Sequence, residues 1–167
     1  MKSKANLKIE SVKISPMKDA NLVIGQSHFI KTVEDLYEAL ATSSPIIKFG
    51  VAFNEASGPR LVRTDGNDDG LIKASFEIAK KIGCGHVFVV LMKNAYPINV
   101  LNRIKSLDEV VNVYVATANE ISVIVADDSQ EGRGVIGIID GKSPIGLESQ
   151  EDRDKRSKFL RNIGYKR

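Results

Sequence analysis

The stretch IIKFGVAFNEASGPR, from Ile46 to Arg60, joins the clearest strand pattern in this chain to its most chemically mixed loop. The first half is apolar almost throughout, which predicts a buried strand over residues 46–53. The second half places a carboxylate, a hydroxyl, a Gly-Pro turn and a guanidinium in one loop. Loops at strand ends often carry function because a rigid scaffold aims their side chains. We therefore expect Glu55, Ser57 and Arg60 to recognise a polar ligand, although an ordinary strand-to-turn junction can have a similar composition.

Strand and helix patterns alternate on either side of this stretch. Strands at 7–14 and 21–24 precede a helix that opens at Thr32, where Asp35 three residues later predicts a capping box. The last three expected strands are close together in sequence, so hairpin pairing is plausible among them. This order predicts an α/β fold, with a single domain over residues 1–167 and a mixed β-sheet covered by helices. The other expected elements are a short strand at 61–63, a helix at 71–82 ended by Gly83, a strand at 86–92, a helix from Pro97 to Lys105, strands at 110–116, 121–126 and 135–140, and a helix at 151–163.

The composition is that of a soluble globular protein. The chain has 167 residues, of which 43% are hydrophobic and 27% charged, so one domain can bury a core without covalent staples. A net charge of +3 arises from 24 basic and 21 acidic side chains, which is too small an excess for a nucleic-acid-binding protein. With four tyrosines, six phenylalanines and no tryptophan, the chain offers few stacking platforms. We expect no nucleic-acid partner.

Three features indicate the compartment. Cys84 is the only cysteine, which excludes an intrachain disulfide and fits a reducing, cytoplasmic location. The N-terminal residues MKSKANLK lack the apolar core of a signal peptide. The longest apolar run, from Val87 to Met92, is far too short to cross a bilayer, so we expect no membrane partner.

Two histidines stand beside expected strand ends. His28 follows Gly-Gln-Ser and precedes a helix start, where backbone N–H groups favour an anion and an imidazole could hold a phosphoryl group. His86 lies at the entrance of the buried strand that follows Cys84. Either ring could instead make one structural hydrogen bond. Two histidines and one cysteine, with neither CxxC nor HExxH, make a poor zinc set, so we name no metal ligands.

Polar side chains follow two further expected strands. Asn94 and Asn99 could read a base or a ribose with their amides, or could cap the helix that begins at Pro97. Gly132-Arg133-Gly134 would let a guanidinium and the backbone approach a phosphate, although a plain hairpin turn would look the same. The sequence contains no Walker A loop, Rossmann glycine set, protein-kinase signature or hydrolase GxSxG elbow.

Together these segments resemble the adenosine-specific kinase family of archaeal and bacterial proteins. The likeness covers nearly the whole chain after the first twenty residues, and the joint order of its blocks is highly specific. The matching blocks are IGQSHFIKTVEDLYEAL (24–40), IKFGVAFNEASGPRLVR (47–63), GHVFVVLMKNAYPINVLNRIK (85–105), GRGVIGIIDGKSP (132–144) and FLRNIGYK (159–166).

The resemblance implies an α/β fold, a homotrimer, and a site for adenosine or AMP. It also implies that a histidine carries a phosphoryl group, His28 in the first place and His86 in the second. It specifies neither a cofactor nor the phosphate donor.

These implications fit the chemistry of the candidate residues. An adenine needs amide partners such as Asn94 and Asn99, and ribose hydroxyls favour a carboxylate such as Glu55, which is also the best general-base candidate. A phosphate favours Arg60 and Arg133.

The leading hypothesis is therefore an adenosine- and AMP-binding protein that acts as an adenosine-specific kinase through a phosphohistidine. Two alternatives stay open. One is a non-catalytic adenosine or AMP sensor, which the missing triphosphate loop favours. The other is an interaction module whose polar loops form an oligomer interface.

Overall fold

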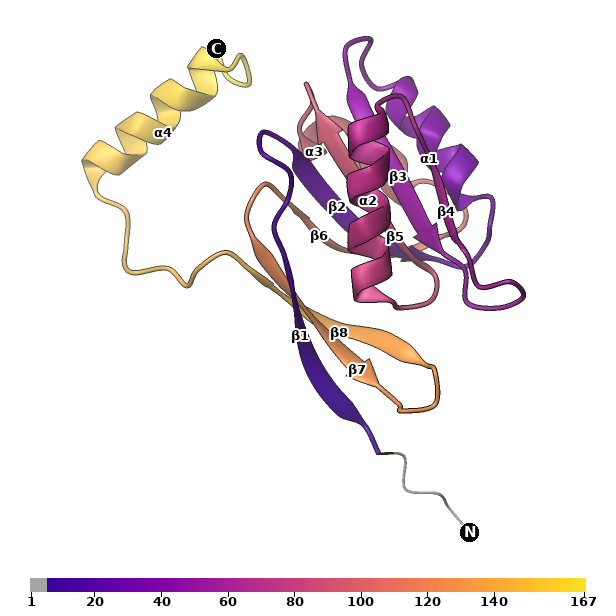
Figure 1. Cartoon of the computed structure of the whole chain (residues 1–167). Coiled ribbons are helices and arrows are strands. Elements are labelled where there is room, and N and C mark those ends of the chain that lie inside the picture. Colours follow the sequence, from indigo (N-terminus) through magenta and orange to yellow (C-terminus); the bar gives the residue numbers. More distant parts are fainter. Residues whose placement is uncertain (1–5) are drawn as a thin grey trace.

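The computed structural model describes residues 6–167 (Figure 1). All the elements expected from the sequence are present, and only their ends differ by a few residues. Pro97 begins one helix and Gly83 ends another in the left-handed conformation, as predicted. The elements are β1 (Lys8–Ile14), β2 (Asn21–Ser27), α1 (Thr32–Ala41), β3 (Lys48–Asn54), β4 (Val62–Gly66), α2 (Asp69–Ile82), β5 (Val87–Lys93), α3 (Pro97–Lys105), β6 (Val110–Thr117), β7 (Ile121–Asp127), β8 (Arg133–Asp140) and α4 (Gln150–Asn162).

The strands form two sheets. A five-stranded sheet has the order β4-β3-β5-β2-β6, and a three-stranded sheet has the order β1-β7-β8. Every neighbouring pair is antiparallel. The expected α/β class and single domain are confirmed, with two antiparallel sheets in place of one mixed sheet. The expected hairpin pairing holds for β7 and β8, whereas β6 pairs with β2 in the other sheet.

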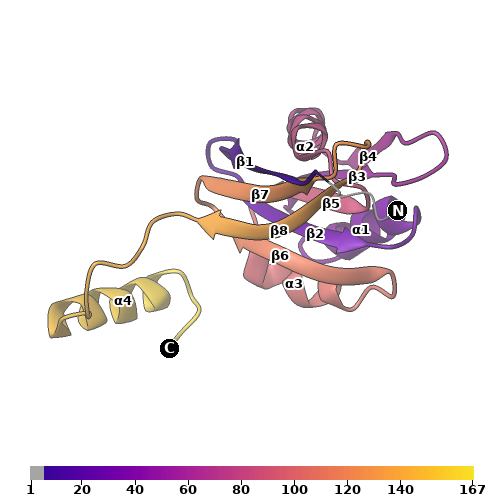
Figure 2. The same ribbon diagram turned by 90° about the horizontal axis from the view of Figure 1, so that it is seen from below.

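The five-stranded sheet is covered on both faces (Figures 1 and 2). α1 and α3 cover one face, where Leu36 is buried in the same cluster as Phe49. α2 and the three-stranded sheet cover the other face, where Leu71 and Val123 share a cluster with Ile24. A strand covered on both sides must be apolar on both sides, which explains the unbroken apolar run of β5.

The start of α1 differs from the prediction. Lys31, not Thr32, occupies the N-cap position, and no side chain caps the helix there. The Thr32 hydroxyl instead donates to the carbonyl oxygen of Phe29 and shares a hydrogen bond with the Ser27 hydroxyl. The expected capping box with Asp35 is therefore wrong, because the buried Thr32 side chain ties α1 to the end of β2.

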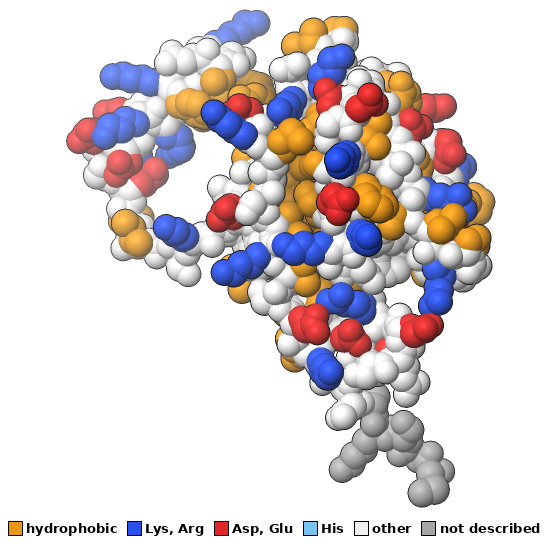
Figure 3. Space-filling model, in the orientation of Figure 1, with side chains coloured by type: hydrophobic (Ala, Val, Ile, Leu, Met, Phe, Trp, Pro, Cys, Tyr) orange, Lys and Arg blue, Asp and Glu red, His pale blue; other side chains and the backbone are white. Residues whose placement is uncertain are grey.

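The C-terminal helix stands apart from the rest of the chain. The linker after β8 runs away from both sheets, and α4 has no buried residue (Figures 1 and 2). In the space-filling view an opening separates α4 from the body (Figure 3). Among residues 6–167, none of the helices combines the length and apolar character that crossing a bilayer would need.

Gly50 allows α2 to approach β3 closely. A Cβ atom at this position would lie 2.2 Å from backbone atoms of Leu71 and Ile72, which is closer than real Cβ contacts. The Ser75 hydroxyl adds a hydrogen bond of 2.9 Å to the Gly50 carbonyl oxygen. The helix and strand are thus in direct backbone contact at Gly50.

We expect Gly50→Ala to lower the free energy of unfolding by about 3 kcal/mol, because the added methyl group meets backbone that cannot move aside without disturbing the core. Chemical denaturation followed by circular dichroism measures the change. Gly70→Ala is the matched control, since a Cβ there would meet only the end of the Asp68 side chain at 3.3 Å. We expect a change below about 1 kcal/mol for the control. Equal stability of the two variants would contradict the close approach.

Candidate functional site

The antiparallel order brings four strand ends to one edge of the five-stranded sheet. β2 and β3 end at this edge, while β5 and β6 begin there. The register pairs Gln26 with Val87 and Phe53 with Phe88, so the residues just beyond these pairs are neighbours. His28 after β2, Glu55 after β3 and His86 before β5 therefore lie at the same edge.

A cavity of about 270 Å³ lies at this edge, between the loops that follow β2 and β3. Both histidines line it, together with Glu55 and Ser57 of the loop after β3. Four predicted site residues thus line one cavity, although they are spread along the sequence from His28 to His86. The lining residues are His28, Phe29, Ile30, Phe53, Glu55, Ala56, Ser57 and His86.

His86 is held firmly by its backbone. Its N–H donates to the carbonyl oxygen of Asn54 at 2.7 Å, and its own carbonyl oxygen accepts from the N–H of Ser27 at 3.0 Å. Its φ of 63° lies in the left-handed region, which a histidine adopts only where the surroundings enforce it. The ring stacks on Phe53 at a centroid distance of 5.9 Å. β2 and β3 together therefore fix the position of this imidazole.

His28 is held differently, and its support was missed by the sequence analysis. Its backbone N–H donates to the carbonyl oxygen of Glu109 at 3.0 Å, while its side chain is exposed. Glu109 is only 2% exposed, and neither of its carboxyl oxygens has a hydrogen-bond partner. Burial raises the pKa of this carboxyl above its usual range, and the nearby Asp35 acts in the same direction. No local pattern marks Glu109, because its burial arises only when β6 starts beside α1.

Glu55 is a fixed acceptor at the boundary of the cavity. Its side chain is 8% exposed, and its carboxylate accepts hydrogen bonds of 2.8 Å from the backbone N–H of Leu61 and from Arg63 Nε. The Leu61 N–H and then the Arg63 guanidinium hold the pKa of this carboxyl below its ordinary value. A carboxylate stabilised in its charged form is a weak proton acceptor. The lowered pKa therefore argues against Glu55 as a general base and favours a role in holding the loop after β3.

A second cavity of about 610 Å³ adjoins the first and shares Glu55 and Ala56 with it. Three cationic side chains line it, from three different elements: Arg60, Lys80 and Arg133. The two cavities touch where Gly85 approaches Ala56 so closely that a Cβ on the glycine would lie 2.8 Å from that of the alanine. One cationic and one histidine-lined space thus lie side by side.

Ion pairs join this second cavity to the three-stranded sheet. Arg60 Nη1 lies 2.6 Å from a carboxylate oxygen of Glu131, in the loop between β7 and β8. Arg133 Nη2 lies 2.8 Å from Glu10 on β1, and its buried Nε has no hydrogen-bond partner. Both Arg60 and Glu131 have left-handed backbone, with φ of 55° and 75°. Strained residues of this kind concentrate at functional sites.

Asn54, which the sequence analysis overlooked, lies beside the second cavity with an unpaired side-chain oxygen. Its Nδ2 donates to the carbonyl oxygens of Ala79 and Cys84, each at 2.9 Å. Its buried Oδ1 has no partner, although buried amide oxygens are usually satisfied. Asn54 also lines the second cavity. The unpaired oxygen is itself buried, so a ligand group could reach it only if the Asn54 side chain shifted.

The comparison with protein families bears directly on this site. The model of the family described as adenosine specific kinase matches residues 12–166, which include every residue of both cavities. This chain belongs to the adenosine-specific kinase family. The resemblance noted in the sequence is thereby confirmed, and the family name suggests kinase chemistry on adenosine for the family.

A solved structure supports the same conclusion for the fold. The crystal structure of the PH1918 protein from Pyrococcus horikoshii OT3 is similar to this adenosine-specific kinase family member, with 48% sequence identity and a TM-score of 0.90. The match covers 96% of this chain and 99% of that one. Among curated proteins, no match was found.

The two asparagines lie at the opposite edge of the sheet in this family member. Asn94 follows the far end of β5 and donates to the carbonyl oxygen of Ile46 at 3.2 Å. Asn99 accepts from the N–H of Tyr96 at 2.8 Å and thereby caps α3. Within one chain, neither amide lies at the histidine edge. The capping alternative describes Asn99 best.

Cys84 and the acidic residues add no second site. The Cys84 thiol is buried, and burial raises its pKa to about 11, so it is a core residue as expected and not a nucleophile. Within residues 6–167, no three His, Cys, Asp or Glu side chains converge as a metal site would require.

We expect Glu55→Gln to destabilise the family member near neutral pH and much less in acid. The pKa of Glu55 is lower in the folded than in the unfolded chain, so its stabilising contribution is complete above the ordinary value of 4.5 and disappears as the pH falls through the lowered pKa. Thermal unfolding at about pH 7 and about pH 3 measures the difference.

Glu34→Gln serves as the control for this measurement, since Glu34 is exposed on α1. We expect it to follow the wild type at both pH values. If the unfolding temperatures of wild type and Glu55→Gln differ by the same amount in acid as at neutral pH, the role assigned to the carboxylate is contradicted.

Proposed function

We propose that this protein is a cytoplasmic adenosine- and AMP-binding enzyme that transfers a phosphoryl group through a histidine. The observation that carries the proposal is the meeting of His28, His86 and Glu55 in one cavity, directly beside a second cavity lined by Arg60 and Arg133. The name of the family to which the chain belongs indicates adenosine as the substrate.

The two cavities together suit a purine riboside with a 5′-phosphate. The Glu55 carboxylate stays charged and can accept from ribose hydroxyls at the boundary it shares between the cavities. A small shift of the Asn54 side chain would let its unpaired, buried Oδ1 accept from an amino or hydroxyl group, which is the role first expected for Asn94 and Asn99. Arg60 and Arg133 provide planar donors for phosphate oxygens.

The proposed reaction exchanges a phosphoryl group between a histidine and the nucleoside. The 5′-hydroxyl oxygen of adenosine attacks phosphorus as the histidine N–P bond breaks, and the ring nitrogen recovers its electron pair and takes up the hydroxyl proton. We assign the N–P bond to His28, since its side chain is exposed at the cavity, whereas His86 is only partly exposed. Catalysis then depends on positioning and on charge stabilisation by the arginines.

We also propose that the protein works as a homotrimer, as the family resemblance implies. Large apolar side chains stay exposed on the single chain, among them Phe29 and Ile30 at the rim of the smaller cavity. Apolar surface beside a site is typical of a subunit interface or of a ligand contact. Sedimentation velocity of the wild-type chain gives the number of subunits.

We expect Arg60→Ala to weaken AMP binding about tenfold while changing adenosine binding about twofold or less, because only AMP carries the anion that the guanidinium would bind. Isothermal titration calorimetry with each ligand measures both constants. Arg103→Ala is the control, since Arg103 lies on α3 and bonds to Thr42. Equal losses for the two ligands would remove Arg60 from the phosphate site.

We expect the protein, phosphorylated on histidine with radioactive phosphoramidate, to pass its label to adenosine and form AMP. The protein-bound label should be labile to acid, as a phosphorus–nitrogen bond is. His28→Gln should abolish the transfer to adenosine, whereas His86→Gln should lower it without removing it. Loss of transfer only in His86→Gln would reverse the roles of the two histidines.

The same measurement separates the enzyme from the sensor. If adenosine and AMP bind by calorimetry but the phosphorylated wild-type protein passes no label to adenosine, the phosphohistidine mechanism is wrong and the protein is a non-catalytic sensor. If neither ligand binds, the proposed site itself is wrong.

A further inference from the structure

The three-stranded sheet has one side that packs on the protein core and one that does not. Val12, Val123 and Ile138 face the core. Side chains alternate along a strand, so their sequence neighbours point the other way. We call this second side the outer face; its cross-strand row Lys13–Ser122–Ile139 runs over all three strands.

The outer face is unusually apolar for a surface in water. It carries three large apolar side chains that are exposed on β1 and β8 or next to them, namely Leu7, Ile9 and Ile139. A fourth, Ile136, is exposed at a β-bulge of β8, beside the core-facing Val135. An antiparallel sheet with one side in water normally has polar residues on that side. Single exposed apolar residues are ordinary, but a group of four across neighbouring strands is typical of a surface that another chain covers.

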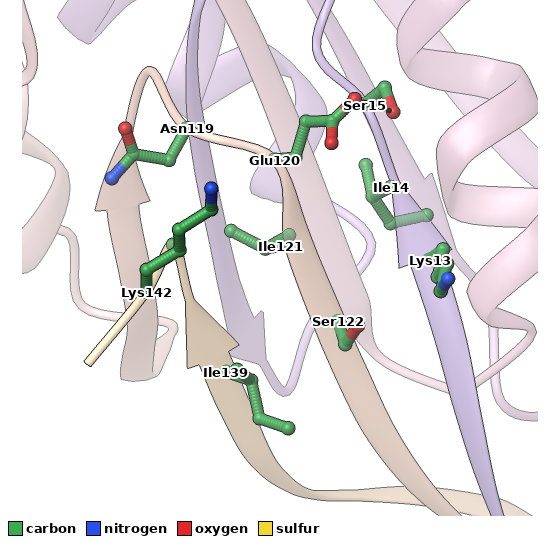
Figure 4. Close-up of a pocket in the computed structure, with 10 residues that line it drawn as sticks. Lys13, Ile14, Ser15, Asn119, Glu120, Ile121, Ser122, Ile139 and Lys142 are labelled. Carbon is green, nitrogen blue, oxygen red and sulfur yellow. Dashed lines mark hydrogen bonds between the residues drawn. The ribbon is translucent and has the colours of Figure 1, made fainter.

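The outer face ends in a hollow of about 590 Å³ (Figure 4). The row of Lys13, Ser122 and Ile139 lines this hollow, together with Gly141 and Lys142, with which the linker to α4 begins. The hollow and the exposed apolar side chains are therefore parts of one continuous surface. Polar side chains line most of the hollow, while Ile139 joins it to the exposed apolar side chains of the outer face.

The C-terminal segment has matching side chains without a partner. We call residues 141–167 the arm. Ile145 and Phe159 are exposed, and Leu147 is 93% exposed. The Ser149 side chain and Asp152 form a reciprocal capping box, so the sequence specifies α4 although the helix buries nothing in its own chain.

The arm does not cover the outer face of its own chain. It leaves the end of β8 and runs away from the three-stranded sheet (Figures 1 and 2). Its far end instead approaches α3, where Asn99 Nδ2 lies 3.5 Å from the Tyr165 hydroxyl. The space-filling view shows the arm standing off the body with orange side chains exposed on it (Figure 3).

We propose that the arm of one copy of this chain binds the outer face of a second copy, with Leu147 and Ile145 packing on Ile136 and Ile139. The arm belongs to the fold, since the family match extends to residue 166 and the solved relative matches 96% of the chain. The contact joins two different surfaces, so it is heterologous and can close into a ring. This inference rests on the proposed homotrimer for the number of copies alone and uses nothing of the histidine site.

The test compares full-length variants that each disable one side of the contact. We expect Leu147→Lys on the arm and Ile136→Lys on the outer face each to weaken self-association at least about tenfold, toward the 18.3 kDa monomer. Val111→Lys, at an exposed apolar position on β6, is the matched control and should keep the wild-type mass. Sedimentation velocity over a range of concentrations measures mass, and circular dichroism checks that each variant folds.

Mixing the two variants sharpens the test. The Ile136→Lys chain keeps an intact arm and the Leu147→Lys chain keeps an intact outer face, so the mixture should form a species of two chains that neither variant forms alone. Wild-type protein that is monomeric at all concentrations would overturn the proposal, as would an arm that folds onto its own chain. Full association of Leu147→Lys would also overturn it, by showing that outer faces pair without the arm. Adenosine titration of the same samples reports separately on the histidine site.

Discussion

The antiparallel pairing of β5 with both β2 and β3 is the constraint on which the rest of the structure depends. It buries one apolar strand between two others and brings the end of β2, the end of β3 and the start of β5 to a common edge. Both histidines and the loop after β3 are placed by that geometry alone. The same pairing sends the end of β5, with Asn94, to the opposite edge.

The edge is rigid where it carries chemistry. His86 is tied to β3 and β2 through both of its backbone groups, and Glu55 is held by Leu61 and Arg63. Fixed donors and acceptors need no rearrangement when a ligand arrives, which is how a preorganised site lowers the barrier for charge transfer.

Much of this architecture could be predicted from local patterns. The unbroken apolar run at 87–92 indicated a buried strand, and the polar loop after residue 53 indicated a site. Pro97 marked the start of one helix and Gly83 the end of another. Long-range pairing was harder to predict, because the choice of β2 over β7 as the partner of β6 depends on how two sheets stack. Asn94 was assigned to the site because it follows a strand end, but periodicity does not say which edge of the sheet that end reaches. Glu109 and Asn54 carry no local signal at all, since their burial and their unpaired oxygens arise only from the tertiary fold.

The ion pair between Arg60 and Glu131 has a consequence for how the larger cavity is entered. The two residues belong to loops of different sheets, and both are well exposed to solvent. An anion that takes the Nη1 group of Arg60 would compete with Glu131 and weaken the contact that holds the β7–β8 loop. By reciprocity, anything that restrains this loop against Arg60 makes the anion bind less tightly. The loop leads directly into β8 and from there into the C-terminal segment. Binding of an anion to Arg60 would therefore be thermodynamically linked to the freedom of the β7–β8 loop.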